Sequence, residues 1–238
     1  MVDAIILAGG EGKRLKQVVR DVPKPLAVVD GKPFLDVLLD QLNESGCINR
    51  VVLAVGYKAE KIIAEYKYCS RFNFEIVFSI EDNLLGTGGG IKKALGLTDT
   101  EAVLAMNGDS YAQVDIAGLM KAHNDNKAKL TIVLVKSEDA GRYGIVTVDA
   151  AGRINCFEEK SGHGRAGLIN AGVYLFDRHI FDDVPQNKVL SIEKELFPRF
   201  LQTFKGYVYG YAVNGKFIDI GVPETYKIAH SYLAGKNV

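Results

Sequence analysis

The chain has 238 residues, of which 47% are hydrophobic and 24% charged, enough to bury the core of one large α/β domain. Its 29 basic residues balance its 29 acidic residues, so no overall positive field favours nucleic acid or an anionic membrane surface. No apolar run approaches the roughly 20 residues of a membrane span, and the acidic start at Asp3 is unlike a signal peptide. We expect a cytoplasmic protein that binds small molecules, with no nucleic-acid or membrane partner.

Apolar runs that predict buried strands alternate with amphipathic runs that predict helices. In the first half the expected strands are 4–7, 51–55, 75–79 and 102–106, and the expected helices are 33–43, 59–66 and 89–95. In the second half the expected strands are 130–136, 171–176 and 207–212, with a hairpin of 144–148 and 153–158 and helices at 192–201, broken near Pro198, and 223–233. This pattern predicts an α/β fold: a mixed, mainly parallel sheet with helices on both faces, in a single domain over 1–238.

A glycine turn that carries cations follows the first predicted strand directly. The sequence over 7–15 is LAGGEGKRL, and Lys24 lies a little further on between two prolines that stiffen its backbone. Unobstructed backbone amides beside Lys13, Arg14 and Lys24 suit the negative charge of a polyphosphate. An ordinary strand-to-helix turn and a solvated lysine are the alternatives.

A second glycine segment, LGTGGG over 85–90, opens the predicted helix 89–95. Missing β-carbons and unpaired amides let a flat base or a phosphate approach the main chain there, with a flexible loop as the alternative. Neither segment is a common nucleotide motif. The first lacks the third glycine of the Rossmann fingerprint, and 88–93 lacks the spacing and the hydroxyl residue of a P-loop.

Two aspartates far apart in the chain are candidate metal ligands. Asp109 follows Asn107 and Gly108 at the end of a predicted core strand, and Asp219 lies in FIDIG between apolar neighbours. Two carboxylates that converge would suit Mg²⁺, which prefers a few hard oxygen ligands together with substrate phosphates. Each aspartate alone is also a common turn former or helix cap.

In their order along the chain, these motifs resemble those of the sugar-1-phosphate nucleotidyltransferases. The matches are AGGxGxRL at 8–15, KP at 24–25, a glycine-rich loop at 85–89, GD at 108–109, FxEK at 157–160, NAGVY at 170–174, and an aspartate before a glycine and a proline at 219–223. The common family form has threonine where this chain has Lys13. An ordered set that covers nearly the whole chain is far more specific than any single match.

The resemblance implies a three-layer, Rossmann-like fold of the nucleotide-diphospho-sugar transferase type, with a nucleotide-binding half at about 1–110 and a sugar-binding half at about 111–238. It implies that an oxygen of a sugar 1-phosphate attacks the α-phosphorus of a nucleoside triphosphate, giving a nucleotide sugar and pyrophosphate. Mg²⁺ would be the cofactor, and a homodimer is an expectation at the family level. Such chemistry needs positioning and charge stabilisation more than a covalent nucleophile.

The resemblance also assigns roles to residues of this chain. Arg14 would stabilise the leaving pyrophosphate and Lys24 would hold the α-phosphate, so both are catalytic candidates. The implied nucleotide-binding residues are Leu7, Ala8, Gly9, Gly10, Gly12, Lys13, Arg14, Gly86, Thr87, Gly88, Asn107 and Gly108. Gly144, Glu158, Lys160 and Asn170 would bind the sugar phosphate, and Asp109 and Asp219 would hold Mg²⁺.

Within the family, the stretch over 18–36 most resembles the D-glycero-D-manno-heptose 1-phosphate guanylyltransferases, which serve bacterial surface glycans. We therefore expect GTP as donor and the heptose 1-phosphate as acceptor. The alternatives are a mannose-1-phosphate guanylyltransferase, a glucose-1-phosphate thymidylyl-, uridylyl- or cytidylyltransferase, and a non-catalytic nucleotide-sugar-binding subunit. A glycosyltransferase usually has a DxD pair, whereas Asp109 is followed by Ser110 and Tyr111.

Overall fold

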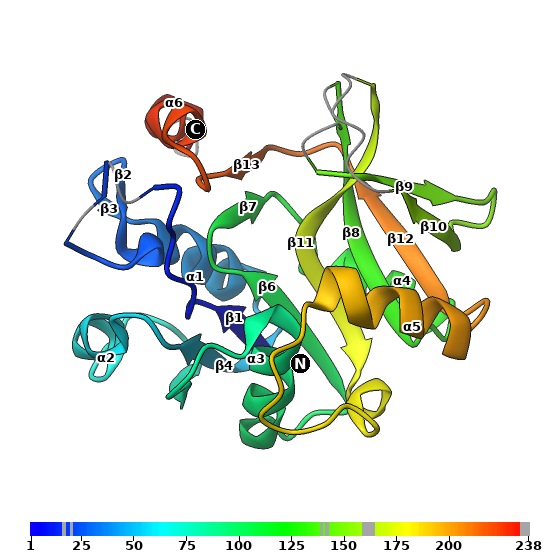
Figure 1. Ribbon diagram of the computed structural model, residues 1–238, viewed down its shortest axis with the longest axis horizontal. Helices are drawn as coiled ribbons and strands as arrows, with labels where there is room; N and C mark the ends of the chain where they lie inside the picture. The colour runs from blue at the N-terminus through cyan, green and yellow to red at the C-terminus, as the bar shows by residue number, and fades with distance from the viewer. Residues whose placement is uncertain (16–17, 20, 139, 141–142, 159–164, 234–238) are drawn as a thin grey trace.

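A seven-stranded mixed sheet runs through both halves of the chain (Figure 1). The computed structural model describes residues 1–15, 18–19, 21–138, 140, 143–158 and 165–233. The strand order is β12-β8-β11-β6-β1-β4-β5, formed by β1 (Val2–Leu7), β4 (Ile48–Val55), β5 (Glu75–Ile80), β6 (Ala102–Asn107), β8 (Leu130–Ser137), β11 (Gly167–Asp177) and β12 (Val208–Val213). Neighbouring strands are parallel except β11, which is antiparallel to both β6 and β8. The predicted mixed, mainly parallel sheet is confirmed.

Helices cover both faces of this sheet, which gives three layers (Figure 1). One face packs against α1 (Phe34–Ser45), α2 (Ala59–Tyr66), α4 (Ile116–Asp125) and α6 (Pro223–Leu233), and the other against α3 (Gly86–Ala94) and α5 (Phe197–Thr203). Side chains of β1 alternate between the two cores, with Ala4 and Ile6 in one and Ile5 in the other, as a strand buried on both faces requires. Among the described residues, no helix has the length and apolarity needed to cross a membrane.

Short elements connect the main strands and helices. They are the 3₁₀ turns η1 (Lys24–Leu26), η2 (Leu95–Leu97) and η4 (Arg178–Phe181), and the pairs β2 (Val28–Val29) with β3 (Lys32–Pro33), β7 (Ser110–Ala112) with β13 (Phe217–Asp219), and β9 (Ile145–Val148) with β10 (Ile154–Glu158). The last pair confirms the predicted hairpin. The short strands β7 and β13 and the helix α4 were not expected from the sequence.

Two predicted helix boundaries differ from the structure. The glycine segment is the first turn of α3, which begins at Gly86 rather than near 89. The helix expected over 192–201 is instead a π-turn, η5 (Ile192–Leu196), that continues directly into α5. The irregularity lies just before Pro198, because proline has no amide hydrogen to donate to residue 194 and a wider turn accommodates its ring.

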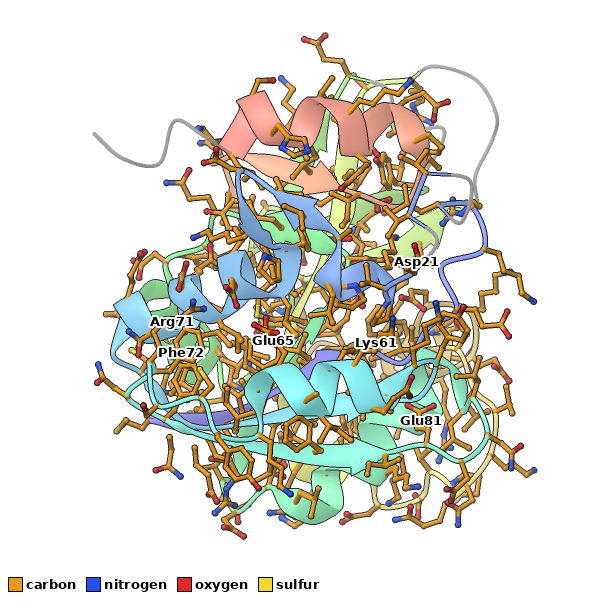
Figure 2. All side chains as sticks on the ribbon, turned by 90° about the vertical axis from the view of Figure 1, so that its left-hand side faces the viewer. Asp21, Lys61, Glu65, Arg71, Phe72 and Glu81 are labelled. Atoms are coloured by element: carbon orange, nitrogen blue, oxygen red, sulfur yellow. The ribbon has the colours of Figure 1, made fainter. Side chains whose placement is uncertain are left out.

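The outer face of α2 fixes the chain that leads to Lys24 (Figure 2). Lys61 of α2 donates a hydrogen bond to the backbone oxygen of Asp21 at 2.5 Å. On the same side of the molecule, the buried carboxylate of Asp36 in α1 accepts from the Tyr66 hydroxyl at 2.7 Å and pairs with Arg71 at 2.8 Å. These contacts hold α1 and α2 together and tether the segment before η1.

His123 in α4 makes the stability of the fold dependent on pH. Its ring is buried, with Nδ1 2.8 Å from Thr131 Oγ1, and burial lowers its pKa from 6.5 to about 4. The unfolded chain therefore takes up this proton at a higher pH than the folded chain, so stability falls as pH drops from 6.5 towards 4. Over this range the melting temperature should fall more steeply for wild type than for His123→Gln; parallel curves for the two proteins would contradict this assignment.

Candidate active site

A pocket of about 370 Å³ opens at the carboxyl ends of β1 and β6. These strands are parallel neighbours with Leu7 opposite Asn107, so the glycine turn after β1 and the turn after β6 meet at one edge of the sheet. The first turn of α3 and Gly221 close the remaining sides. Ligands of parallel α/β sheets bind at such carboxyl ends.

Glycines bring the walls of this pocket close together. Gly108 donates its N–H to the Leu7 oxygen at 2.9 Å, and a β-carbon on Gly108 would lie 2.5 Å from that oxygen. Gly86 has a φ of +70°, and a β-carbon there would lie 2.6 Å from the backbone oxygen of Leu190. At Gly10, by contrast, an added β-carbon would meet no atom within 4 Å, so its backbone is open to the pocket. Only glycine fits the first two positions, and the third lets a ligand reach the main chain.

Lys24 and the two aspartates converge at one side of the pocket, whose lining includes Lys24 and Asp109 but not Asp219. The Lys24 ammonium lies 2.5 Å from Asp109 Oδ2 and 3.8 Å from Asp219 Oδ1. Pairing of β7 with β13 causes this convergence, because it sets Asp219 opposite Ser110. The Ile220 N–H also donates to the Asp109 backbone oxygen at 2.9 Å. Two carboxylates separated by 110 positions therefore share one cation.

The ionised form of Asp219 depends on positive charge between it and Asp109. Burial, followed by the like charge of Asp109, raises the pKa of Asp219. Lys24, the Gly221 N–H at 2.5 Å and Arg14 oppose that rise. Two carboxylates around one cation position are the hard oxygen ligands that Mg²⁺ takes, and the Asp109 side chain is 39% exposed, so the donor set fits a divalent ion.

Comparison with known proteins identifies the family. The family described as nucleotidyl transferase matches residues 3–235. The chain belongs to this family. It is 40% identical over 235 residues to the D-glycero-alpha-D-manno-heptose 1-phosphate guanylyltransferase of Aneurinibacillus thermoaerophilus, covering 98% of each chain. It is 36% identical over 225 residues to the mannose-1-phosphate guanylyltransferase of Mycobacterium tuberculosis, but spans only 62% of that relative. The crystal structure of HddC from Yersinia pseudotuberculosis complexed with GMP-PN has a TM-score of 0.85 at 36% identity, covering 98% of this chain and 100% of that one.

The pocket of this nucleotidyl transferase contains nearly all of the residues predicted to bind nucleotide. Its lining includes Leu7, Ala8, Gly9, Gly10, Gly12, Lys13, Arg14, Gly86, Thr87, Asn107 and Gly108, together with Lys24 and Asp109. Gly88 does not line it. Its N–H donates to the Leu190 oxygen at 2.8 Å, and a β-carbon would lie 2.7 Å from Leu196 Cδ1. The structure therefore places Gly88 behind the pocket wall, where it lets α3 approach the chain around 190.

Thr87 connects the pocket to the second half of the nucleotidyl transferase. Its hydroxyl donates to Glu193 Oε2 at 2.9 Å and accepts from the Ile192 N–H, also at 2.9 Å. Nearby, the Leu190 N–H donates to the Leu85 oxygen at 2.9 Å. The first turn of α3 is thus supported by residues 190–193.

Two of the predicted sugar-phosphate residues, Gly144 and Asn170, lie outside the lining of the nucleotide pocket. Asn170 lies in β11, where its side chain accepts from the Gly172 N–H at 2.8 Å and donates to the Tyr174 hydroxyl at 3.0 Å. Gly172 packs directly on the Asn107 side chain, so this part of β11 lies beside the pocket. Gly144 precedes β9, Glu158 ends β10, and Lys160 lies outside the described residues. Their contacts with a sugar phosphate remain predictions.

Glu81 is a pocket residue that the sequence reasoning missed. It follows β5, is 9% exposed, and its Oε2 accepts from the Leu85 N–H at 2.8 Å. Burial raises the pKa of this carboxyl, while the Leu85 N–H and Lys93 act in the opposite direction. Its position could have served as a signal, because it follows a predicted parallel strand and lies four residues before the second glycine segment. Pro25, Leu84 and Gly221 also line the pocket without having been predicted.

Proposed function

We propose that this protein transfers a guanylyl group from GTP to D-glycero-α-D-manno-heptose 1-phosphate and releases pyrophosphate. The observation that carries nucleotidyl transfer is the convergence of Lys24, Asp109 and Asp219 beside a glycine-walled pocket. The choice of heptose is supported by the Aneurinibacillus relative, which is similar over 98% of both chains. The Mycobacterium relative, named for mannose 1-phosphate, extends well beyond the matched region.

In the proposed reaction, fixed charges of the protein bind the phosphates and stabilise the transition state. Lys24 would hold the α-phosphate, and Arg14, an exposed residue of the pocket lining whose charge acts on Asp219, would stabilise the leaving pyrophosphate. Asp109 and Asp219 would hold Mg²⁺, which neutralises phosphate charge when bound. The acceptor phosphate is already an anionic nucleophile, so no general base is needed. Fixed charges near the α-phosphorus favour the transition state because no solvent has to reorganise around it.

Glu81 supports guanine as the base. Guanine presents N1–H and an exocyclic amino group as adjacent donors, which a single carboxylate can accept together. The Leu85 N–H engages only Oε2, and the carboxyl group lines the pocket beside Gly9 and Gly90. Adenine has an acceptor at N1 and would face this carboxylate unfavourably, and uracil and thymine offer only one such donor. Buried groups left unpaired by the wrong substrate are the usual source of strong discrimination.

Pyrophosphate release tests the proposal. Wild-type protein with Mg²⁺, GTP and the heptose 1-phosphate should release pyrophosphate, and should do so faster than with mannose 1-phosphate or glucose 1-phosphate as acceptor and faster than with UTP, dTTP, CTP or ATP as donor. Faster pyrophosphate release with another donor and acceptor would identify that pair as the substrates instead. No release with any pair would favour a nucleotide-sugar-binding subunit, which thermal shifts with nucleotide sugars would detect. A cytoplasmic location and a homodimer are further predictions.

A further inference from the structure

The Lys24 ammonium lies where the proposed metal would lie. It is within 4 Å of both carboxylates that would hold the ion, and its side chain is only 8% exposed. A divalent cation held by both carboxylates would compete with this ammonium, because the ammonium already lies 2.5 Å from Asp109 Oδ2 and 3.8 Å from Asp219 Oδ1. Two cations at such close range repel each other strongly when little water separates them.

The backbone of Lys24 and the first part of its side chain are also held in place. Lys24 lies between Pro23 and Pro25 and is the first residue of η1, and the Ala27 N–H donates to the Lys24 oxygen at 3.0 Å. Gly12, with a φ of +59°, packs on the stem, and a β-carbon there would lie 3.2 Å from Lys24 Cβ. The base of the side chain is therefore fixed, so moving the ammonium requires rotation about the outer bonds of the side chain.

The other lysine of the pocket has a different environment. Lys13 has a side chain that is 81% exposed and pairs with Glu11 at 3.0 Å, whereas Lys24 pairs with the two aspartates. Lys13 adds positive charge to the same pocket without occupying the position between the carboxylates. Lys13 is therefore a matched comparison for Lys24.

We propose that Lys24 is a placeholder cation: in the nucleotide-free protein it fills the metal position, and it leaves that position only when a triphosphate offers its ammonium a new anionic partner. The inference rests on the proposed function for the identity of that partner. A partly buried ammonium that lost both carboxylates without replacement would carry an uncompensated charge, so a metal ion alone displaces it poorly. Metal and nucleotide must then bind cooperatively, and each raises the affinity for the other.

Mn²⁺ binding measured by calorimetry or by the electron paramagnetic resonance of free Mn²⁺ tests this inference. Without nucleotide, Lys24→Met should bind Mn²⁺ about tenfold to a hundredfold more tightly than wild type, since the competing charge-assisted hydrogen bond is gone. Lys13→Met should stay within about twofold of wild type, because exposed charges are screened. Adding Asp219→Asn to Lys24→Met should abolish the gain.

The outcomes separate the inference from the proposed function. Equal or weaker Mn²⁺ binding by Lys24→Met, an equal gain in Lys13→Met, or a gain that survives Asp219→Asn would each overturn the placeholder role. Lys24→Gln, read by the Mn²⁺-induced rise in melting temperature, replaces Lys24→Met if the latter does not fold. Pyrophosphate release by wild type is measured separately, so the proposed function can fail while the Mn²⁺ result stands, and the reverse also holds.

Discussion

Asp109→Asn should lower the turnover number for pyrophosphate release by about a hundredfold to a thousandfold or more, the range seen when one preorganised charge-stabilising group is removed. The amide keeps the shape of the side chain but loses the charge that Lys24 and the proposed metal require. Asp219 would be left as the single carboxylate at the cation position. Burial raises the pKa of Asp219, so its ionised form is less favourable and it compensates poorly for the lost charge of Asp109.

The same substitution should leave the fold nearly intact. The Asp109 side chain is 39% exposed, and the backbone oxygen that accepts from Ile220 is unchanged. Circular dichroism and the melting temperature should therefore resemble those of wild type. Asp125→Asn is the matched control, since Asp125 is an exposed partner of Lys121 at the end of α4 and should keep full activity. Wild-type turnover in Asp109→Asn would remove this residue from the catalytic machinery.

Glu81→Gln should change the preference for the base. Its ratio of kcat/KM for GTP over UTP should fall by about tenfold to a hundredfold, the value of one hydrogen bond to a charged group at about 1.5 to 3 kcal/mol. The amide oxygen can still accept from the Leu85 N–H, so the start of α3 keeps its support. The amide nitrogen then presents hydrogens where one of the two guanine donors needs an acceptor.

The melting temperature of Glu81→Gln should rise at neutral pH even as guanine selectivity is lost. Burial raises the pKa of Glu81 above 4.5, so above that pH the folded state holds this proton more tightly than the unfolded state. Stability therefore declines as pH increases through this window, and the neutral amide removes the decline. Asp82→Asn, an exposed neighbour, controls for charge loss near the pocket. Unchanged selectivity in Glu81→Gln would assign guanine recognition to other groups.

The sequence predicted the sheet and the pocket well because both depend on local patterns. Continuous apolar runs identified the buried strands, and glycine segments after strand ends identified the turns that meet at the carboxyl edge. The strands β7 and β13 were missed because three residues each are too short for a periodic signal. The convergence of Asp109 and Asp219 depends on the pairing of these two strands, so the family resemblance could suggest it but residue spacing could not.

The position of Gly88 also could not be read from the chain alone. Whether a glycine near a pocket contacts the ligand or the protein depends on what packs behind it, and here residues 190–196 fill that space. Glu81 was missed for a related reason. An acidic residue after a strand is common, and only the fold shows that this carboxyl is buried and lines the pocket.

The support that residues 190–193 give to the first turn of α3 limits how such proteins can be recombined. Leu190 and Glu193 come about a hundred positions after Gly86 and Thr87, yet their contacts support the first turn of α3, which lines the pocket. A chimera joined near residue 110 would combine the glycine segment of one parent with residues 190–193 of another. A chimera would keep the base preference of one parent only if the glycine segment over 85–90 and residues 190–193 both came from that parent.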